Sequence, residues 1–422
     1  VLLSALAFAA SEKVSYTGYH SILIPQVTSD EVSIVRSLAD TDDRVRQVML
    51  MNDHLVAGME ANLLVSPEQA SYVMSILDQF EIPFDIVSSD FQSWIDEVDS
   101  LNEINKQKWI ADFESGNKRK PDFYMTNSEI NDWMNDLAND YSYATVSTTG
   151  TSIEGQDFFQ LDVDATIVSN PKHVYINGGI HAREWISPAT MQWIIHEVIT
   201  GTSDDAVRMR ENYIWHIPPV INPDGYDYTW ANRMWRKNRR INSGSSCIGV
   251  DLNRNWGWGW DGPGSSTDPC SDTYRGASAD SEPEVRAVED QLMAIGGENI
   301  VLYMDVHSYS QFWLVPWGGT TEKPDDYAEL KAGGDAAAAA IRSVNNLSFL
   351  VGTPPDILYV ASGGSFDWAK GHAGVKYTYA PELRPASAGA GGFVIPPENI
   401  DPSGKEIFAG VVANIDFAAS NP

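Results

Sequence analysis

The stretch that most constrains the fold of this chain is a predicted strand, turn and helix between residues 173 and 195. Residues 173–177 are apolar and β-branched, which predicts a buried strand. A helix is expected beyond the turn, with Ser187 as a candidate N-cap and Pro188 at its first position. Open α/β sheets build their sites at the carboxyl ends of such strands. We therefore expect an α/β sheet with a site at this turn.

The turn carries His181 and Glu184, which are three residues apart. Residues at this spacing on a helical turn point the same way, so the imidazole and the carboxylate could reach one cation. Histidine and glutamate are normal ligands of catalytic zinc. The spacing is also common by chance, and a solvated ion pair is the alternative explanation. A metal site therefore needs a third ligand from elsewhere in the chain.

His307 is the best candidate for that ligand among the eight histidines. It ends the predicted buried strand 299–306 and precedes the turn-like residues 308–310, which repeats the setting of His181. Two histidines and one glutamate leave one zinc position open, as in catalytic zinc sites. The sequence therefore predicts a catalytic rather than a structural metal site.

Hydrolysis at such a site also needs a general base and a cation that stabilises developing negative charge. Glu382 follows a predicted strand and so lies at a strand's carboxyl end. Arg236 belongs to the basic run 233–240, which a solvated basic helix explains as well. Asn253 and Arg254 place an amide beside a guanidinium, and this pair suits a bidentate grip on a carboxylate.

The order of elements predicts two domains. The front part has the order βαββαβ, which is typical of a ferredoxin-like α+β sandwich. Its predicted strands are 20–26, 48–50, 58–65 and 83–87. Strands then alternate with helices to the end of the chain, which predicts a mixed, mostly parallel sheet with helices on both faces. Its predicted strands are 158–163, 173–177, 213–218, 299–306, 312–316 and 375–379.

Two segments suggest secretion and processing. Residues 1–10 are apolar and end in small residues, like the end of a secretory signal peptide, so we expect a secreted protein. Residues 114–121 are polar and basic and predict an exposed linker that a trypsin-like protease cuts after Lys118 or Arg119. Pro121 should hinder a cut after Lys120. An ordinary interdomain loop is the alternative.

Charge and cysteine content bear on partners and compartment. The chain of 422 residues has a formal net charge of -30, so nucleic acid and anionic membrane should repel it, and we expect neither as a partner. Cys247 and Cys270 are its two cysteines. In an oxidising compartment they most simply form one disulfide, and two free buried thiols are the alternative.

Several blocks of sequence carry a family resemblance. They read HAREW (181–185), NPDGY (222–226), NRMWRK (232–237), GVDLNRNW (249–256), HSYSQ (307–311), YVASGGS (359–365) and ELR (382–384). In these blocks the sequence resembles the secreted zinc metallocarboxypeptidases of the pancreatic A/B family, which are made as proenzymes. The resemblance implies a carboxypeptidase-like α/β fold, a signal remnant at 1–10, a propeptide domain at 11–100, an activation linker at 101–120 and a catalytic domain at 121–422. It also implies a monomer.

The resemblance implies roles for the matching residues. His181, Glu184 and His307 would hold one Zn²⁺ per chain, and Asp251 would accept a hydrogen bond from His181. Glu382 would be the catalytic base, and Arg236 would stabilise the oxyanion. The residues expected to bind a substrate with a free C-terminal carboxylate are Arg183, Asn253, Arg254, Ser308, Tyr309, Tyr359 and Phe366. A cis peptide at Ser308–Tyr309 and a disulfide between Cys247 and Cys270 are implied too.

Phe366 occupies the position whose residue type, in the resembling family, goes with the preference for the C-terminal side chain of the substrate. Because it is uncharged, the A-type preference for hydrophobic or aromatic C-terminal residues is favoured over the B-type preference for Lys and Arg. Phe366 is bulkier, and Ala380 smaller, than the usual residues at these positions. A non-catalytic secreted binding protein is the remaining alternative, with the aromatic run 256–260 as its binding face.

Overall fold

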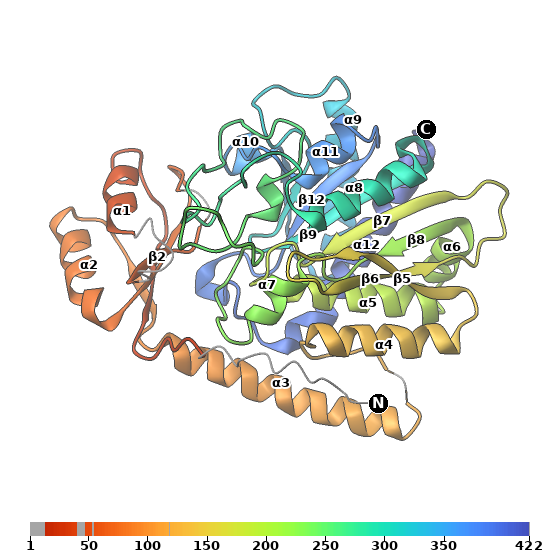
Figure 1. The fold of residues 1–422 in the computed structure, drawn as a ribbon, viewed down its shortest axis with the longest axis horizontal. Coiled ribbons are helices and arrows are strands. Elements are labelled where there is room, and N and C mark those ends of the chain that lie inside the picture. The colour runs from red at the N-terminus through yellow and green to blue at the C-terminus, as the bar shows by residue number, and fades with distance from the viewer. Residues whose placement is uncertain (1–12, 40–46, 53–54, 118, 422) are drawn as a thin grey trace.

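The computed structural model describes residues 13–39, 47–52, 55–117 and 119–421. The expected signal remnant at 1–10 and the expected cleavage residue Lys118 lie outside the described residues. The chain forms a small front domain, drawn red and orange in Figure 1, and a large domain beside it. None of the helices in the described part of the chain is long and apolar enough to cross a membrane.

The front domain is a four-stranded antiparallel sheet with the strand order β2-β3-β1-β4. Its apolar core includes Ile22 and Leu63 from the sheet and Val35, Val73 and Leu77 from the two helices. This arrangement confirms the predicted ferredoxin-like sandwich. Its elements are β1 His20–Ile24, α1 Val32–Leu38, β2 Val48–Leu50, β3 Ala61–Val65, α2 Pro67–Gln79 and β4 Asp85–Ser88.

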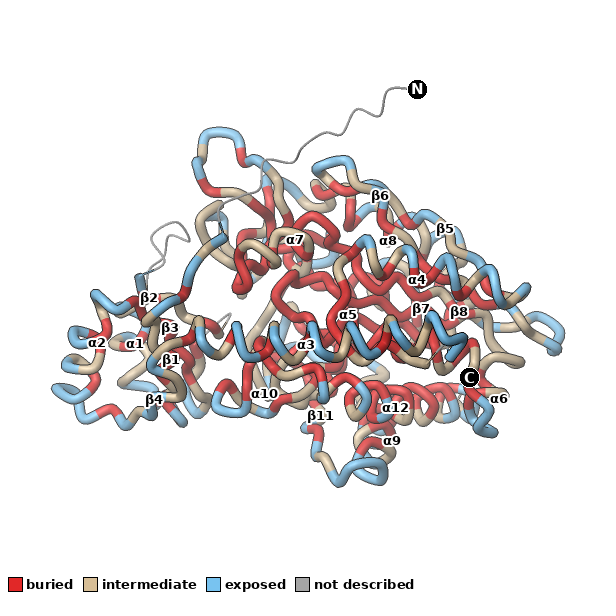
Figure 2. Tube along the Cα trace, turned by 90° about the horizontal axis from the view of Figure 1, so that it is seen from below, coloured by how far each residue is buried: buried red, intermediate tan, exposed pale blue. Residues whose placement is uncertain are grey.

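A single long helix, α3 Phe91–Glu114, connects the front domain to the large domain. It runs along the edge of the large domain in Figure 1, and Figure 2 shows its exposed and less exposed residues in alternation. Its buried residues include Ile95, Val98 and Trp109. The helix crosses residue 100, where we expected the propeptide domain to end, so the expected linker is helical over most of its length.

The large domain contains an eight-stranded sheet with the order β11-β10-β12-β9-β7-β8-β6-β5. Four of its strand pairs are parallel and three are antiparallel, which confirms the predicted mixed sheet. The strands are β5 Ala144–Thr151, β6 Asp157–Val163, β7 Lys172–Gly178, β8 Tyr213–Ile217, β9 Ile300–Ser308, β10 Phe312–Leu314, β11 Leu350–Gly352 and β12 Thr378–Leu383. The edge strands β5 and β11 were not predicted.

Helices cover both faces of this sheet. Along β7, Val174 and Ile176 pack into one apolar core and Tyr175 packs into another, because successive side chains of a strand point to opposite faces. The first core includes residues of α4, α5, α9 and α12, and the second includes residues of α8 and α11. The helices are α4 Asn127–Asp140, α5 Ile186–Thr200, α6 Asp204–Asn212, α7 Pro223–Tyr228, α8 Pro283–Ile295, α9 Tyr327–Asn345, α10 Pro354–Ile357, α11 Ser365–Gly371 and α12 Ile400–Ser420.

Strands β7, β9 and β12 are adjacent and parallel, so their carboxyl ends meet at one edge of the sheet. The turn after β7 leads directly into α5. Ser187 is not the N-cap of α5 as expected, because the helix begins at Ile186, two residues before the expected first position Pro188, and its N-cap is Trp185. The Ser187 hydroxyl instead donates to the Val306 carbonyl and accepts from the Gly179 backbone N–H, which ties the turn to β9.

Candidate active site and metal centre

The predicted metal ligands meet at this edge of the sheet. His181 and Glu184 lie in the turn after β7, and His307 lies at the end of β9. The Nδ1 atoms of the two histidines are 3.2 Å apart, and Glu184 Oε1 lies 2.8 Å from Nδ1 of His181. Ligand atoms bound tetrahedrally to zinc at about 2.0–2.1 Å are about 3.3 Å apart. The donor set therefore fits one zinc ion.

The second nitrogen of each imidazole faces a carboxylate. His181 Nε2 lies 3.2 Å from Asp251 Oδ1, and His307 Nε2 lies 3.1 Å from Asp305 Oδ2. A neutral imidazole that donates from Nε2 keeps the Nδ1 lone pair for a metal. Both rings are thus oriented with Nδ1 toward the common centre.

Neighbouring groups lower the pKa values of two buried carboxylates at the site, Glu184 and Asp251. Burial acts to raise the pKa of Glu184, but His181 and His307 outweigh it and leave a pKa of about 2. Burial likewise acts to raise the pKa of Asp251, and the nearby charges of Arg236 and His181 hold it well below its usual range. Both carboxylates are therefore held in the charged form that favours a cation at the centre.

Arg236 is buried beside the metal ligands and not on a solvated helix, which settles the alternative explanation of the basic run. Its Nε and Nη2 atoms donate to Asp251 Oδ2 at 3.2 and 3.0 Å. Asp251 therefore accepts from Arg236 through one oxygen and lies against His181 through the other. The predicted contact between Asp251 and His181 is present.

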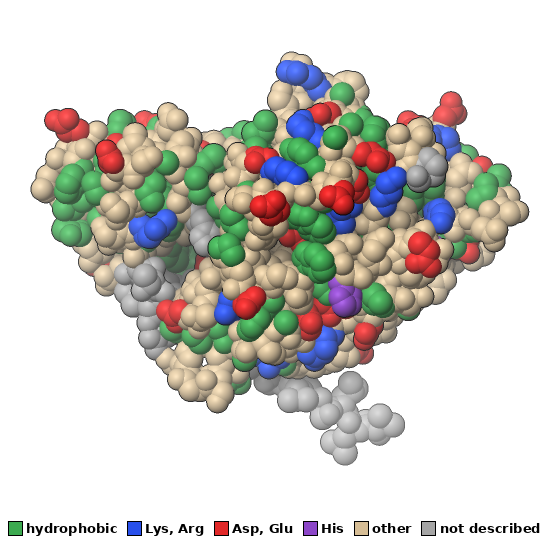
Figure 3. Space-filling view, turned by 90° about the horizontal axis from the view of Figure 1, so that it is seen from above, with side chains coloured by type: hydrophobic (Ala, Val, Ile, Leu, Met, Phe, Trp, Pro, Cys, Tyr) green, Lys and Arg blue, Asp and Glu red, His purple; other side chains and the backbone are tan. Residues whose placement is uncertain are grey.

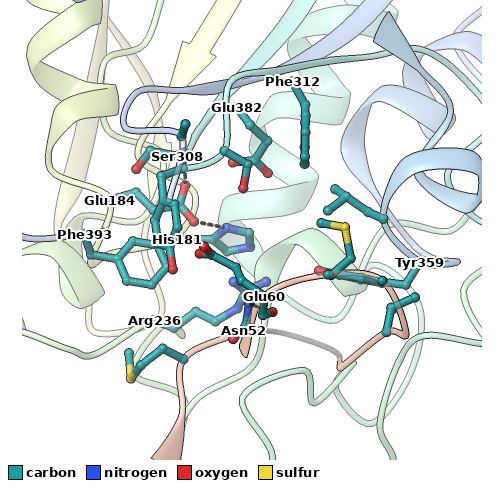
Figure 4. A pocket seen from close by; sticks show the side chains of 18 of the residues that line it. Asn52, Glu60, His181, Glu184, Arg236, Ser308, Phe312, Tyr359, Glu382 and Phe393 are labelled. Carbon is teal, nitrogen blue, oxygen red and sulfur yellow. Dashed lines mark hydrogen bonds and ion pairs between the residues drawn. The ribbon is translucent and has the colours of Figure 1, made fainter. Parts of the chain in front are cut away.

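Glu382 lies within β12 and not after its strand, because β12 starts and ends later than predicted. Its Cα is paired with His307 of β9 on one side and with Phe312 of β10 on the other. Figure 4 shows its carboxylate among the side chains that line a cavity of about 250 Å³, with those of His181, Glu184 and Arg236. The register of three strands thus brings the expected base to the ligands.

Residues of the front domain line the same cavity, a feature that no residue motif predicted. They include Met51, Asn52, Met59 and Glu60. Glu60 accepts a hydrogen bond from the Ala388 backbone at 3.0 Å, and burial raises its pKa. Figure 4 shows Asn52 and Glu60 on the side of the cavity opposite Glu382. The front domain therefore covers the site.

Of the expected carboxylate anchors, Arg254 is buried, whereas Asn253 and Tyr359 are half-buried. Arg254 donates from Nε to the Gly264 carbonyl and from Nη1 to the Asn253 carbonyl, both at 2.9 Å. The Asn253 side-chain oxygen accepts from the Ser365 backbone N–H at 3.0 Å. Among the described residues, the cavity lining includes neither Asn253 nor Arg254, whereas it does include Tyr359.

Arg183, Ser308 and Tyr309 are placed around the ligands. Arg183 is buried, pairs with Asp272 at 3.2 Å and donates to the Met51 carbonyl of the front domain. The Ser308 backbone N–H donates to a Glu184 oxygen at 3.0 Å. The peptide between Ser308 and Tyr309 is cis, as expected. Tyr309 lines the cavity.

Phe366 is buried at the start of α11, beside the segment that follows β10. A Cβ atom on Gly318 would lie 3.1 Å from the Phe366 ring and 3.3 Å from Pro354, so glycine makes room for the aromatic ring. The carboxylate of the next residue, Asp367, accepts from the backbone N–H groups of Gly318 and Gly319. Burial, partly offset by these hydrogen bonds, raises the pKa of Asp367 to about 6.

The two cysteines form a disulfide, as expected, with a Cα–Cα distance of 5.1 Å between Cys247 and Cys270. The expected cleavage residue Arg119 is half-buried. It pairs with Asp112 at 2.6 Å and with Asp122 at 2.7 Å. Of the expected linker beyond α3, residues 115–117 are exposed.

Asp305 is the one residue at the ligands that the sequence analysis missed. It is fully buried in β9, two positions before His307, and alternate residues of a strand share a face. A charged residue inside an otherwise apolar strand is a signal that could have identified it, because buried carboxylates need partners.

Comparisons with known proteins agree on one family. Residues 130–410 match the family described as zinc carboxypeptidase, and residues 24–98 match that described as carboxypeptidase activation peptide. A carboxypeptidase B of Astacus astacus is 43% identical over 299 residues, which cover 70% of this chain and 96% of that protein. Zinc carboxypeptidase A 1 of Drosophila melanogaster is 32% identical over 416 residues, covering 97% and 94%.

A solved structure extends the similarity to the whole fold. The crystal structure of thrombin activatable fibrinolysis inhibitor superposes with a TM-score of 0.87 and is 30% identical in sequence. The match covers 96% of this chain and 100% of that one, so it includes both the front and the large domain.

Proposed function

This chain belongs to the zinc carboxypeptidase family and carries the activation peptide of a zymogen, and from that premise we propose that, once cut, it removes apolar residues from the free carboxyl end of peptides. The observation that carries the proposal is the arrangement of Glu382 and Arg236 around the cavity that His181 and Glu184 also line. A base and a cation line one space with two of the metal ligands, and the front domain covers this space in the uncut chain.

We propose the following roles in the reaction. Zinc bound by the three ligands supplies a Lewis acid that polarises the peptide carbonyl and activates water. Glu382 takes the proton of the attacking water and passes it to the leaving amine. Arg236, held by Asp251, donates to the oxygen on which negative charge develops. This division of roles needs the carboxylate and the guanidinium to line one cavity, and both line it.

Arg254, with Asn253 and Tyr359, is proposed to bind the terminal carboxylate of the substrate. The carbonyls of Gly264 and Asn253 fix the Arg254 guanidinium, so little further ordering is needed when a carboxylate arrives. A substrate with an amidated end could not form the charge-assisted hydrogen bonds that a terminal carboxylate would form with the Arg254 guanidinium. Exopeptidase activity follows from this anchor.

The apolar surroundings of Phe366 support the preference for hydrophobic or aromatic C-terminal residues. Phe366 belongs to a buried apolar cluster that includes Leu314 and Ala380. The nearby Asp367 carboxylate is turned to the backbone of the Gly318 segment and accepts hydrogen bonds there. Neither the Phe366 ring nor this engaged carboxylate favours a Lys or Arg side chain of a substrate.

A basic-residue preference is the second candidate, because the relative from Astacus astacus carries the name carboxypeptidase B. The two candidates differ in what the residue at position 366 must do. An uncharged aromatic ring favours apolar side chains by burial, whereas a preference for Lys requires a carboxylate within reach of the ammonium.

A scan of C-terminal residues separates the candidates. The chain is cut with trypsin, the trypsin is inactivated, and kcat/KM is measured on matched peptides ending in Phe, Leu, Lys and Glu. We expect Phe and Leu to exceed Lys and Glu. The matched variant Phe366→Asp should gain about 10- to 100-fold for Lys relative to Leu, since a charge-assisted hydrogen bond contributes about 1.5–3 kcal/mol. A wild-type optimum at Lys would contradict the proposal.

Secretion and the activating protease are also proposals. The signal-like residues at the start of the sequence and the disulfide support an oxidising compartment. A trypsin-like enzyme is proposed to cut after Lys118 or Arg119, next to the exposed residues 115–117. Lys120, beyond the cut, pairs with Glu197 of α5 and lies 3.6 Å from the Trp193 ring centroid. These contacts would keep the new end on the large domain.

A further inference from the structure

We propose that Asp305 is a positioning residue of the metal site, which orients the His307 imidazole and strengthens zinc binding. The inference concerns how the chain holds its metal, and it does not depend on the preference for apolar substrates. It rests on contacts of Asp305 with three different elements of the fold.

The first observation is the direct contact of Asp305 with His307. Both residues lie on β9, two positions apart, so their side chains share a face of the strand. His307 Nε2 lies 3.1 Å from Asp305 Oδ2, and both residues are almost completely buried. In this low-dielectric setting a hydrogen bond to a carboxylate is stronger than in water. It therefore fixes both the tautomer and the plane of the ring.

The second observation is that Asp305 is the acceptor at this nitrogen. Asn253 Nδ2 lies 3.2 Å from His307 Nε2, but this amide nitrogen carries hydrogens of its own. Its orientation is set by the Asn253 oxygen, which accepts from the Ser365 backbone N–H. An Nε2–H of His307 can thus donate to Asp305 and not to Asn253, and Nδ1 keeps its lone pair for the metal.

The third observation is that Asp305 is itself held in place. Asn177 of β7 donates from Nδ2 to its Oδ1 at 2.7 Å, and the Ser365 hydroxyl of α11 donates to its Oδ2. The carboxylate is therefore fixed before any metal binds. Such preorganised partners of metal-binding histidines typically contribute 10- to 100-fold in metal affinity.

Asp305 differs from Asp251, the carboxylate that contacts His181. Asp251 contacts both His181 and the Arg236 guanidinium, so its negative charge is shared with a cation. The hydrogen-bond partners of Asp305 in the described part of the chain are an amide, a hydroxyl and an imidazole. Its charge acts mainly on His307, which should make that ring the more basic ligand.

The test is the zinc affinity of the full-length proenzyme, measured by competition with a chromogenic chelator. Asp305→Asn keeps the size of the side chain and removes its charge, and we expect zinc to bind about 10- to 100-fold more weakly. Asp367→Asn is the matched control, because it removes the charge of another buried carboxylate in α11, one whose hydrogen-bond donors are the backbone N–H groups of Gly318 and Gly319. We expect its zinc affinity to stay within about 3-fold of wild type.

Two outcomes would overturn the proposal. One is an Asp305→Asn protein with wild-type zinc affinity. The other is an equal loss in both variants, which would assign the effect to packing around α11. A second measurement covers the case in which Asp305→Asn does not fold. Nitrogen-15 NMR of the zinc-loaded wild-type chain should show His307 protonated at Nε2. A proton on Nδ1 would overturn the assignment.

Discussion

Glu382 is the single residue on which the proposed chemistry depends most. Its place between His307 and Phe312 in the sheet register fixes the backbone from which the carboxylate reaches the cavity. We expect Glu382→Gln to lower kcat by about 10²- to 10⁴-fold, because the amide cannot accept the proton of water. Zinc content should stay at one ion per chain, since Glu382 is not among the ligands.

The assay for this prediction is kcat on a peptide with a free C-terminus, together with the zinc content of the same preparation. Glu322→Gln, a substitution at an exposed position, is the matched control and should retain wild-type kcat. A Glu382→Gln enzyme with wild-type turnover would remove this residue from the mechanism.

At the scale of residues, local spacing predicted the ligands better than it predicted their partners. His181 and Glu184 are close in sequence, and His307 ends a buried strand, so simple rules identify all three. The Asp305 contact and the hydrogen bonds that fix Arg254 depend on segments far apart in the chain. No spacing rule encodes such contacts.

At the scale of elements, the strands buried on both faces were predicted and the edge strands were not. Strand β7 reads as an unbroken apolar run because helices cover both of its faces. The edge strand β5 is rich in threonine, and β11 is only three residues long, so neither shows that pattern. The late end of β12 was missed because Pro381 interrupts the expected strand pattern.

Helix α8 carries the buried acid Glu289, and its titration should affect how the free energy of unfolding changes with pH. Burial, together with the neighbouring carboxyl of Asp280, raises the pKa of Glu289 to about 9 from its ordinary value of 4.5. The folded state therefore keeps a proton that the unfolded state releases, so this contribution to stability is complete below pH 4.5 and is lost as the pH rises toward 9.

Glu289→Gln mimics the protonated acid at every pH. We expect the Tm of this variant, relative to wild type, to increase between pH 5 and pH 9. The measurement is thermal unfolding of the proenzyme across that range, with the exposed Glu322→Gln as the control for loss of one carboxylate. A difference in Tm between Glu289→Gln and wild type that stays constant from pH 5 to pH 9 would contradict the assigned pKa.

At the scale of the whole molecule, the front domain and the large domain form one covered site. Residues of the front domain line the cavity, and its Met51 carbonyl accepts a hydrogen bond from Arg183. On the face shown in Figure 3, acidic and basic side chains are interspersed, so the excess of negative charge is not gathered into one patch there. The front domain thus contributes part of the wall of the cavity.

The order of the predicted elements indicated two domains. It did not indicate that the front domain and the large domain contact each other at the site. Hydrophobic patterning identifies the elements of the front-domain core, which comes from nearby segments, whereas another core joins residues as far apart as Leu64 and Ala418. The placement of Asn52 and Glu60 in the cavity depends on how the two finished surfaces fit together. Sequence periodicity carries no information about that fit.

The most direct test of the central claim is the hydrolysis of one peptide pair, ending in leucine with a free carboxylate or with an amide. The uncut chain is the baseline, and the cut chain is assayed alone, with a strong chelator, and after zinc is restored. We predict cleavage of the free acid by the cut chain, its loss on chelation, its return with zinc, and negligible cleavage of the amide. Equal cleavage of the two peptides, or activity that survives chelation, would contradict a zinc exopeptidase anchored on a terminal carboxylate.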